Sequence, residues 1–362
     1  MSEKIFNNKT ILIPGGTGSW GKELSKQLLK DFRPKEIRIF SRNELRQVEM
    51  KREFSDPRLK FIIGDVRDLN RFTEAAKGVD YIFHLAAIKH VTVCEENPWE
   101  AVLTNIMGTK NMIDAAIANN VSRAVFVSTD KAVDPLNFYG VTKACAEKIV
   151  IAANNLADKT SFVCVRGGNA LGSTGSVVPL FRKQIFELNK VTLTDPRMTR
   201  FMLSLPEAIQ LIFKATESAA GGEVFVMKMP GLTIPDLIDV MAKELGNKKT
   251  KIESIGIRPG EKIDEVLVSR YEANRVVSLK DYFIILPMID IPRIERFYKG
   301  VKRTNIGEFN SRQTRRLTKT EIKKMLKDNG FLERELIPTD KLIASLSRKH
   351  LEKIAKKEKW VI

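Results

Sequence analysis

The chain has 362 residues, 43% of them hydrophobic, and a formal net charge of +17. No stretch approaches the roughly 18 uncharged apolar residues of a membrane span, and the first residues lack a signal-peptide layout, so we expect a globular cytoplasmic protein. The scattered Cys94, Cys145 and Cys164 fit neither a disulfide framework nor a zinc site, so we expect no bound metal.

The first half of the chain alternates short β-rich runs with helical patterns. Runs rich in β-branched and aromatic residues predict strands over 10–14, 36–40, 59–63, 81–85, 124–128 and 161–165. Helical patterns between them include 22–32, 71–78, 99–120 and 139–157. Strands that alternate with helices form right-handed βαβ units and a parallel sheet with helices on both faces. We therefore predict a doubly wound α/β domain over residues 1–174.

A glycine-rich turn directly follows the first predicted strand. Gly15, Gly18 and Gly21 have the spacing G-x-x-G-x-x-G and precede a helical pattern. Such glycines allow a tight turn, close approach of the backbone to a pyrophosphate, and packing of the helix on the strand. The pattern predicts a Rossmann-type dinucleotide site, whose residues we take as Gly15, Thr17, Gly18, Ser19, Trp20 and Gly21.

The end of the second predicted strand indicates which dinucleotide binds. NAD sites usually have an acidic residue here, which accepts hydrogen bonds from the ribose hydroxyls. This chain instead has Ser41, Arg42 and Asn43, with Arg46 one turn further on. A guanidinium suits a 2′-phosphate, so we predict NADP as the cofactor.

An acidic turn closes the third predicted strand. Asp65 and Val66 are expected at the adenine, where an Asp side chain can accept a hydrogen bond from the amino group. Asp68, in the same turn, has two interpretations: it can lie at the adenine, or it can cap the helix that follows. We assign Asp65 and Val66 to the cofactor site.

A cluster of acid–base residues follows the fifth predicted strand. Thr129, Asp130 and Lys131 stand at the strand end, and Tyr139 and Lys143 lie in the next helical pattern. The spacing of Tyr139 and Lys143 is just over one helical turn, so they can share a face. A nearby ammonium lowers the pKa of a phenol, so we expect Lys143 to make Tyr139 a proton acceptor.

From about residue 175 the pattern changes to short helices, short strands and prolines. Helical patterns cover 177–189, 206–218 and 234–246, and strand patterns cover 222–227, 251–256 and 282–287. We predict a smaller α/β substrate-binding lobe, mainly over 175–300 with some segments returning to the first domain. Such a lobe would close over a ligand at the carboxyl ends of the parallel strands.

Residues 301–362 are lysine-rich and carry much of the excess positive charge. We predict a helical basic C-terminal extension there. Nucleic acid, an anionic membrane surface and an anionic small substrate would all suit a basic protein, and so would a solvated face on terminal helices.

These motifs together resemble those of the extended short-chain dehydrogenase/reductases. HLAAIKHVTVCEENPWEAVLTNIMGTKN, STDKAVDPLNFYGVTK, GNALGSTGSVVPLF, TDPRMTRFMLS and GIRPGEK are similar to UDP-N-acetylglucosamine 4,6-dehydratases, above all to the C5-inverting enzymes of pseudaminic acid synthesis. The resemblance runs from about Asn7 to Leu286, and EFNSRQTRRLTKTEIKKML is similar to the end of capsule-type 4,6-dehydratase/5-epimerases. It implies an NADP-dependent lyase that serves bacterial surface glycan or nonulosonic acid synthesis.

The resemblance implies a role for each member of the acid–base cluster. Tyr139 would remove the proton of the C4 hydroxyl, with Lys143 holding the nicotinamide ribose and Thr129 bonded to O4. Asp130 would be the acid at O6 and Lys131 the base at C5. A lysine can act as that base only when neutral, and we expect burial and neighbouring lysines to lower the pKa of Lys131.

The resemblance also implies contacts elsewhere in the chain. Ala86 and Asn105 match cofactor positions. The implied substrate-binding residues are Lys89, Asn169, Val177, Val178, Thr194, Arg200 and Arg258, with both arginines expected at the diphosphate. The partners implied are a UDP-sugar and further copies of the chain in a dimer or hexamer. No nucleic acid is expected, and weak contact of the basic extension with an anionic membrane stays open.

Four positions depart from the family pattern. Pro14 and Trp20 replace a threonine and a phenylalanine around the glycine turn. Gly167 and Thr174 replace a tyrosine and an arginine, and both are expected near the sugar.

Two other functions are compatible with parts of the sequence. A UDP-hexose 4-epimerase shares the fold, the cofactor and the Tyr139–Lys143 pair, but it has no use for Asp130 and Lys131 as an elimination pair. A non-catalytic NADP-binding protein with a basic interaction tail would not need the Tyr139–Lys143 pair.

Overall fold

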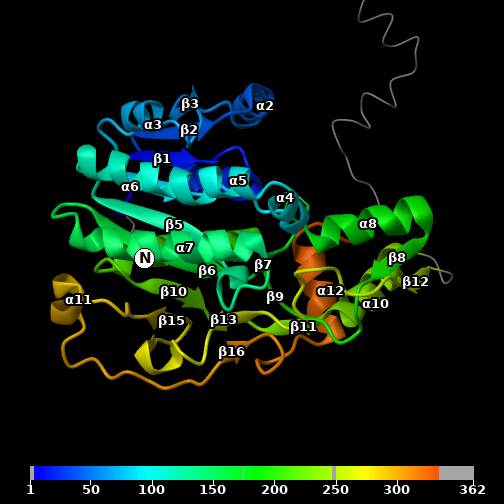
Figure 1. Ribbon diagram of the computed structural model, residues 1–362. Coiled ribbons are helices and arrows are strands. Elements are labelled where there is room, and N and C mark those ends of the chain that lie inside the picture. Colours follow the sequence, from blue (N-terminus) through cyan, green and yellow to red (C-terminus); the bar gives the residue numbers. More distant parts are fainter. Residues whose placement is uncertain (1–3, 174, 247–249, 334–362) are drawn as a thin grey trace, which may run out of the picture.

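The computed structural model describes residues 4–173, 175–246 and 250–333 (Figure 1). The first half contains strands β1 (Thr10–Pro14), β2 (Glu36–Ser41), β3 (Leu59–Ile63), β4 (Tyr81–His84), β5 (Arg123–Thr129) and β6 (Ser161–Gly167). Its helices are α1 (Ser19–Asp31), α2 (Glu44–Phe54), α3 (Leu69–Ala75), α4 (Val91–Glu96), α5 (Pro98–Ala101), α6 (Gly108–Ala118) and α7 (Phe138–Ala152). Each strand predicted in this half is present. No helix in these ranges is long and apolar enough to cross a membrane.

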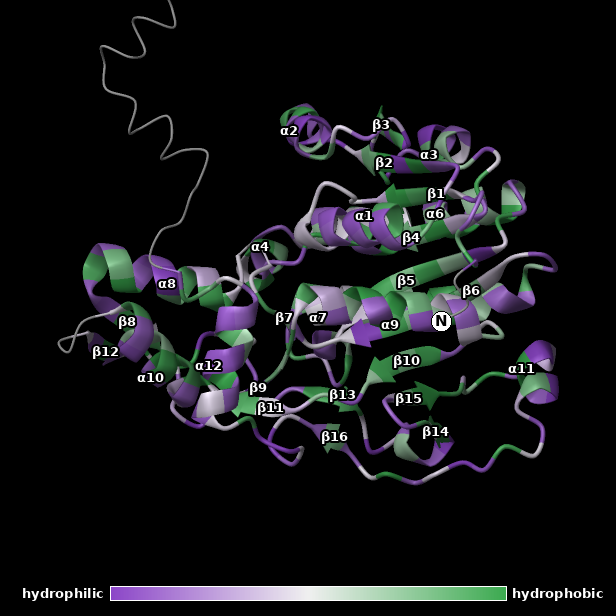
Figure 2. Ribbon diagram, turned by 180° about the vertical axis from the view of Figure 1, so that it is seen from behind, coloured by the Kyte–Doolittle hydropathy of each residue, from purple (hydrophilic) through white to green (hydrophobic). Residues whose placement is uncertain are grey.

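The main sheet of the described chain has nine strands in the order β14-β15-β10-β6-β5-β4-β1-β2-β3. Strands β1 to β6 are parallel to their neighbours, and β10 (Val224–Met227) joins β6 in parallel. Helices α3, α6 and α7 cover one face (Figure 1), and α1 and α9 (Leu205–Ser218) cover the other (Figure 2). The order β3-β2-β1-β4-β5-β6 is that of the Rossmann fold, which confirms the predicted fold class.

The burial of the strands explains this arrangement. Every residue of β1 and β6 is buried, whereas four of the five residues of β3, at the sheet edge, are at least partly exposed. Central strands of a parallel sheet are covered on both faces, so they need unbroken apolar runs rather than alternating ones. Figure 2 shows these central strands as a hydrophobic layer between more polar helices.

The lobe is built from the rest of the chain. Its elements are β7 (Asn169–Ala170), α8 (Val177–Leu188), β8 (Lys190–Leu193), β9 (Thr199–Leu203), β11 (Gly231–Thr233), α10 (Ile234–Leu245), β12 (Lys251–Ser254), β13 (Val266–Val268), β16 (Phe309–Asn310) and α12 (Lys319–Asp328). The segments that return to the main sheet are α9, β10, β14 (Val276–Ser278), β15 (Tyr282–Ile285) and α11 (Pro292–Phe297).

The chain beyond residue 300 is part of this lobe as far as the structure describes it. Strand β16 pairs with β13, and α12 packs on α10 with Ile322 and Leu326 fully buried. Within the described residues, the predicted basic extension over 301–362 thus contributes β16 and α12, which pack as parts of the lobe. Ile322 and Leu326 lie one helical turn apart and form the apolar face of α12, but the lysines around them make this face hard to recognise in the sequence. Residues 334–362 lie outside the described residues.

Candidate active site

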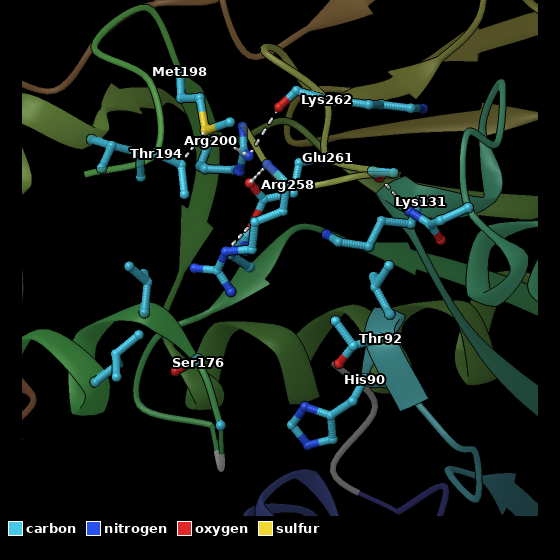
Figure 3. Close-up of a pocket in the computed structure, with 18 of the residues that line it drawn as sticks. His90, Thr92, Lys131, Ser176, Thr194, Met198, Arg200, Arg258, Glu261 and Lys262 are labelled. Atoms are coloured by element: carbon cyan, nitrogen blue, oxygen red, sulfur yellow. Dashed lines mark hydrogen bonds and ion pairs between the residues drawn. The ribbon is translucent and has the colours of Figure 1, made fainter. Parts of the chain in front are cut away.

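A pocket of about 290 Å³ lies where the carboxyl ends of the sheet strands meet the lobe (Figure 3). Its walls come from the chain after β4, the turn after β5, the amino end of α8, and the segment from Arg258 to Glu265. Predicted substrate-binding residues on these walls are Lys89, Asn169, Val177, Thr194, Arg200 and Arg258. The remaining one, Val178, is buried in the core of the lobe. Thr174 lies outside the described residues.

A hydroxyl, a carboxylate and an amine meet at the end of β5. Thr129 ends the strand, and Asp130 and Lys131 begin a 3₁₀ turn. Thr129 Oγ1 donates to Asp130 Oδ1 at 2.7 Å, and Lys131 Nζ donates to the same oxygen at 3.0 Å. Asp130 is only 1% exposed, and its Oδ2 has no hydrogen-bond partner in the described structure.

Asn137 links the amino end of α7 to the lobe. Its Oδ1 accepts from the main-chain N–H of Gly140 at 2.8 Å and so caps α7. Its Nδ2 donates to the carbonyl of Gly260 at 2.8 Å, and Gly260 has a φ of 77°. A Cβ on Gly260 would lie 2.9 Å from the Cβ of Asn137, so the turn needs glycine. One side chain thus sets both the start of α7 and the loop that carries Arg258.

Tyr139 and Lys143 are both buried in α7, yet they do not interact as predicted. Burial raises the pKa of Tyr139 to about 12, and among the cations it is Lys131 that opposes this rise. Lys143 Nζ instead donates to the carbonyl of Val127 at 2.7 Å. Burial lowers the pKa of Lys143 to about 7. The structure therefore does not meet the expectation that Lys143 lowers the pKa of Tyr139, because a partly neutral amine bonded to a carbonyl exerts little field on the phenol.

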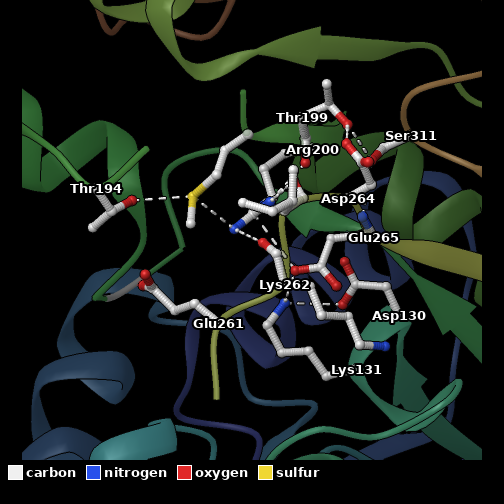
Figure 4. A network of polar contacts seen from close by, with 12 residues as sticks. Asp130, Lys131, Thr194, Thr199, Arg200, Glu261, Lys262, Asp264, Glu265 and Ser311 are labelled. Carbon is white, nitrogen blue, oxygen red and sulfur yellow. Dashed lines mark hydrogen bonds and ion pairs between the residues drawn. The ribbon is translucent and has the colours of Figure 1, made fainter. Parts of the chain in front are cut away.

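Lys131 is held between two carboxylates (Figure 4). Its Nζ lies 3.0 Å from Asp130 Oδ1 and 3.4 Å from Glu265 Oε1. Burial lowers the pKa of Lys131, but Asp130 and Glu265 together raise that pKa above its ordinary value. The expectation of a neutral Lys131 is therefore wrong for the free protein. The pKa values of neighbouring Lys89 and Lys262 are the ones that fall, in each case chiefly through burial, with the charge of Lys131 adding to the effect.

The two predicted diphosphate arginines differ in their availability. All three guanidinium nitrogens of Arg200 contact protein acceptors: Nε lies 3.5 Å from Glu265, and Nη1 and Nη2 donate to the carbonyls of Thr199, Ile263 and Lys262. Arg258 is half exposed and pairs with Glu261 at 3.6 Å (Figure 3). Arg258 is therefore better placed than Arg200 to bind a ligand phosphate.

The glycine turn stands at the point where the strand order reverses, between β1 and β4. Gly15 has a φ of 79°, and a Cβ there would lie 2.7 Å from the main-chain nitrogen of Ala86. A Cβ on Gly21 would lie 2.2 Å from the carbonyl oxygen of Gly16. These close approaches bring the amino end of α1 to the crevice where Rossmann folds bind a pyrophosphate.

The polar groups around this crevice fit a dinucleotide. Thr104 Oγ1 and Ser128 Oγ are buried without a hydrogen-bond partner among the described residues. Buried polar atoms are normally satisfied, so these atoms indicate that a ligand completes the site. A further pocket of about 480 Å³ beside the turn is lined by residues that include Thr17, Gly18, Ser19, Lys22, Lys26 and Arg46.

The end of β2 carries an exposed cation beside an acid. Arg42 Nη1 lies 3.6 Å from Asp65 Oδ2, and Arg67 Nη2 lies 2.7 Å from the same oxygen. Ser41 Oγ accepts from Gln47 within α2. The predicted adenine ligand Asp65 is thus paired with two arginines through one of its oxygens.

Other predicted cofactor residues support the surrounding chain. Asn43 caps α2, and Asp68 caps α3 as its second interpretation proposed. Asn105 accepts from the N–H of Ile88 at 2.8 Å and donates to its carbonyl at 3.0 Å, which shapes the chain after β4. Val66 is buried. Trp20 lies beside Gly167.

Sequence reasoning missed three charged residues of the pocket, Glu261, Lys262 and Glu265. Lys262 ends the GIRPGEK motif, which we used only for Arg258. Its Nζ donates to the carbonyl of Val133, in the turn after Lys131. The motif was a usable signal for Lys262, whereas nothing in the local sequence indicated Glu265.

The strand order, the glycine turn and the Tyr139–Lys143 helix define an extended short-chain dehydrogenase/reductase. Within this class, the family described as polysaccharide biosynthesis protein matches residues 11–287. The chain belongs to this family.

Proteins similar to this chain carry different names. A UDP-N-acetylglucosamine 4,6-dehydratase (inverting) of Campylobacter jejuni is 44% identical over 79% of this chain and 85% of its own. A UDP-glucose 4-epimerase of Rickettsia bellii is 43% identical over 92% of this chain and 99% of its own. The crystal structure of Pen from Bacillus thuringiensis has a TM-score of 0.84 and 41% identity, and the match covers 91% of this chain and 100% of that one.

Proposed function

We propose that this protein is a UDP-N-acetylglucosamine 4,6-dehydratase that inverts C5 and binds NADP. Its product would be a UDP-2-acetamido-2,6-dideoxy-hexos-4-ulose. The observation that carries the proposal is the Thr129–Asp130–Lys131 cluster, which stands beside Tyr139 with Lys131 on the pocket wall. The relatives named as inverting dehydratases support the same activity.

The residues of the site supply the proton transfers of such a reaction. When bound, the nicotinamide supplies the hydride acceptor and donor that the dehydration requires. Tyr139 takes the proton of the C4 hydroxyl, and Thr129 forms a hydrogen bond with O4. Asp130 protonates O6 as that oxygen leaves as water, and Lys131 takes the proton from C5. Once C6 has been reduced, C5 regains a proton that originates from solvent on its opposite face, which inverts this centre.

The hydrogen bond between Lys131 and Asp130 supplies both elimination groups in their working forms. The free protein has an ammonium and a carboxylate 3.0 Å apart. Transfer of one proton from Nζ to Oδ1 gives a neutral amine and a neutral acid without any exchange with solvent. Exclusion of water by a bound sugar favours this neutral pair, because charges are costly in a dry site. Elimination then returns the pair to its ionic form.

The preference for NADP rests on the cations around the adenosine end of the crevice. Ser41 and Arg42 stand where NAD sites usually carry an acid. Lys22, Lys26 and Arg46 line the pocket beside the glycine turn. The same pocket is also lined by Glu23, Glu49 and Glu53, so a 2′-phosphate would depend chiefly on Arg42.

The substrate contacts follow from the available polar atoms. Arg258 would pair with the diphosphate, because its guanidinium is exposed toward the pocket. Asn169 Oδ1 and Ser176 Oγ are buried at the pocket without partners in the described part of the chain, so they would bind polar groups of the nucleotide sugar.

A 4-epimerase is the second candidate, because the relatives with that name match nearly the whole chain. The first proton transfer, from O4 to Tyr139, would be common to both reactions. Epimerisation leaves C5 and O6 untouched, so it would not use Asp130 or Lys131 as acid and base.

Incubation with UDP-N-acetylglucosamine and NADP in deuterated water tests the proposal. NMR should show a 4-keto-6-deoxy sugar with deuterium at an inverted C5. Lys131→Ala is the matched control and should yield no such product. A C4-epimer without deuterium at C5 would establish the second candidate instead, and deuterium at a retained C5 would defeat the inverting assignment.

A further inference from the structure

Glu265 is a buried carboxylate on the pocket wall that no sequence motif indicated. It precedes β13 and is 2% exposed. Its Oε1 lies 3.4 Å from Lys131 Nζ and 3.5 Å from Arg200 Nε (Figure 4). The Oε1 atom of Glu265 thus contacts both the amine of Lys131, which we propose as a catalytic group, and the guanidinium of Arg200.

The C-terminal segment holds Glu265 in place. The N–H of Glu265 donates to Ser311 Oγ at 2.9 Å, and the N–H of Ser311 donates to the carbonyl of Glu265 at 2.9 Å. Ser311 is fully buried, and its Oγ also lies 2.6 Å from Thr199 Oγ1, next to Arg200. Strand pairing between β13 and β16 continues this connection. The position of Glu265 is therefore fixed by residues far beyond the glycine-turn domain.

The second carboxylate oxygen of Glu265 lacks the hydrogen-bond donor that it would have in a purely structural ion pair. Within the described residues, Oε2 is buried without a hydrogen-bond partner. An unsatisfied buried carboxylate oxygen is costly, and native proteins rarely keep one without a reason. A carboxylate that must release a bound cation during a reaction has such a reason, because hydrogen bonds to both of its oxygens would hold it in a single arrangement.

We propose that Glu265 is a positioning residue for the elimination step, which places the amine of Lys131 against the sugar and is itself held by Ser311. The proposal rests on the proposed function, because only a dehydratase needs an amine at C5. Among the described residues, the polar contacts of Glu265 are with Lys131, Arg200 and Ser311 and not with Tyr139, so its loss should leave the first proton transfer unaffected.

The charge of Glu265 also controls the proton shared by Lys131 and Asp130. A carboxylate beside an ammonium favours the protonated form, so Glu265 keeps the proton on the pair up to high pH. The charged and titratable groups that face Lys131 are Lys89, Asp130, Tyr139, Arg200, Lys262 and Glu265. Of these, only Asp130 and Glu265 are carboxylates, and Asp130 is itself part of the pair.

The test compares E265Q with S311A in the full-length protein. E265Q keeps the shape of the side chain and removes its charge, whereas S311A keeps the charge and removes its support. D264N is the matched control: it makes the same carboxylate-to-amide change one residue away, at a side chain bonded to Thr199 and Arg312. Single-turnover measurements follow nicotinamide reduction and deuterium entry at C5 separately, and kcat is followed across pH.

E265Q should slow deuterium entry about tenfold or more, as expected for a misplaced base, and leave nicotinamide reduction at the wild-type rate. Its alkaline loss of kcat should begin about one pH unit or more below that of the wild type. S311A should slow deuterium entry with the alkaline loss unmoved. D264N should change neither.

The outcomes separate the inference from the proposed function. A wild type that produces only a C4-epimer defeats the proposed function and the inference with it. A wild type that dehydrates, together with folded E265Q that has wild-type C5 exchange and pH profile, overturns the inference alone. If E265Q does not fold, S311A decides: wild-type C5 exchange in S311A overturns the inference, and selective slowing supports it.

Discussion

The indole ring of Trp20 occupies the space that a side chain at Gly167 would need. A Cβ built on Gly167 would lie 3.1 Å from Cη2 and 3.5 Å from Cζ2 of Trp20. Trp20 belongs to the first turn of α1, and Gly167 ends β6. Two departures from the family pattern therefore compensate each other: the larger ring of tryptophan in place of phenylalanine fills space that glycine in place of tyrosine leaves open.

This compensation predicts strong coupling between the two positions. Gly167→Tyr alone should lower the free energy of unfolding by about 1–3 kcal/mol, because the new ring meets the indole in a packed site. Trp20→Phe with Gly167→Tyr should recover much of that loss. Chemical denaturation of both single variants and the double variant measures the coupling. Simple additivity of the two effects would show that the ring at position 20 does not fill the space of the absent tyrosine.

Arg42 should decide the preference for NADP. Arg42→Ala removes the exposed guanidinium expected at the 2′-phosphate and leaves Asp65 paired with Arg67 alone. NADP should therefore bind much more weakly, while NAD is little affected or gains from a freer carboxylate. Titration calorimetry with both dinucleotides measures this. Arg52→Ala, the same change at the end of α2, serves as the control, and equal affinity of the wild type for both cofactors would contradict the prediction.

The sequence predicted those parts of the structure whose causes are local. Strands β1 and β6 are wholly buried and mostly apolar, and a mostly apolar run can be recognised without knowing the partners the strands later find. The glycine turn and the Thr129–Lys131 cluster are likewise short segments whose geometry follows from their neighbours in the chain. These elements therefore need no long-range information.

The features that the sequence did not predict all concern contacts between distant segments. The charge state of Lys131 depends on Glu265, the availability of Arg200 depends on the carbonyls of residues 262 and 263, and α12 depends on the apolar face of α10. No local pattern reports such partners. The pKa of a catalytic group is thus the property that sequence reasoning predicts least well, since it sums charges from several elements.

Two truncations should differ in their effects on dehydratase activity and thermal stability. A chain that ends after about residue 335 keeps β16, Ser311 and α12, so dehydration should continue at the wild-type rate. A chain that ends at residue 307 loses Ser311 and exposes the lobe core that Ile322 and Leu326 cover. We expect the shorter chain to unfold at a clearly lower temperature and to lack dehydratase activity. Loss of activity in a folded chain ending at 335 would assign an essential role to residues 336–362.

Tyr139→Phe should reduce turnover by roughly 10²–10⁴-fold, the usual cost of losing a general acid or base. Substrate affinity should be largely kept, because the ring remains. Since burial raises the pKa of Tyr139 to about 12, the phenolate fraction grows as pH rises toward that value. The wild-type rate of nicotinamide reduction should therefore increase with pH, and that of the variant should not. Stopped-flow absorbance provides this comparison, and an unchanged rate in Tyr139→Phe would transfer the role to Thr129 or Asp130.

Lys131→Ala should separate oxidation at C4 from elimination at C5. The variant keeps Tyr139 and Thr129, so the C4 hydroxyl proton is still removed and reduced nicotinamide should accumulate in a single turnover with a bound 4-keto sugar. Without the amine, no group takes the C5 proton. Release of the 4-keto-6-deoxy product at the normal rate would show that Lys131 is not the C5 base.

Lys131→Glu provides a sharper test, because glucose-nucleotide relatives are expected to carry a carboxylate as this base. In this chain the new carboxylate would join Asp130 and Glu265, which are 1% and 2% exposed. Crowded buried carboxylates raise one another's pKa, so the cluster would retain an extra proton and leave the new base largely neutral. Lys131→Glu alone should therefore restore little C5 exchange, and Lys131→Glu with Glu265→Gln should restore more. Deuterium entry at C5 in both variants is the measurement. If the single variant is as active as the double, Glu265 does not set the protonation of this cluster.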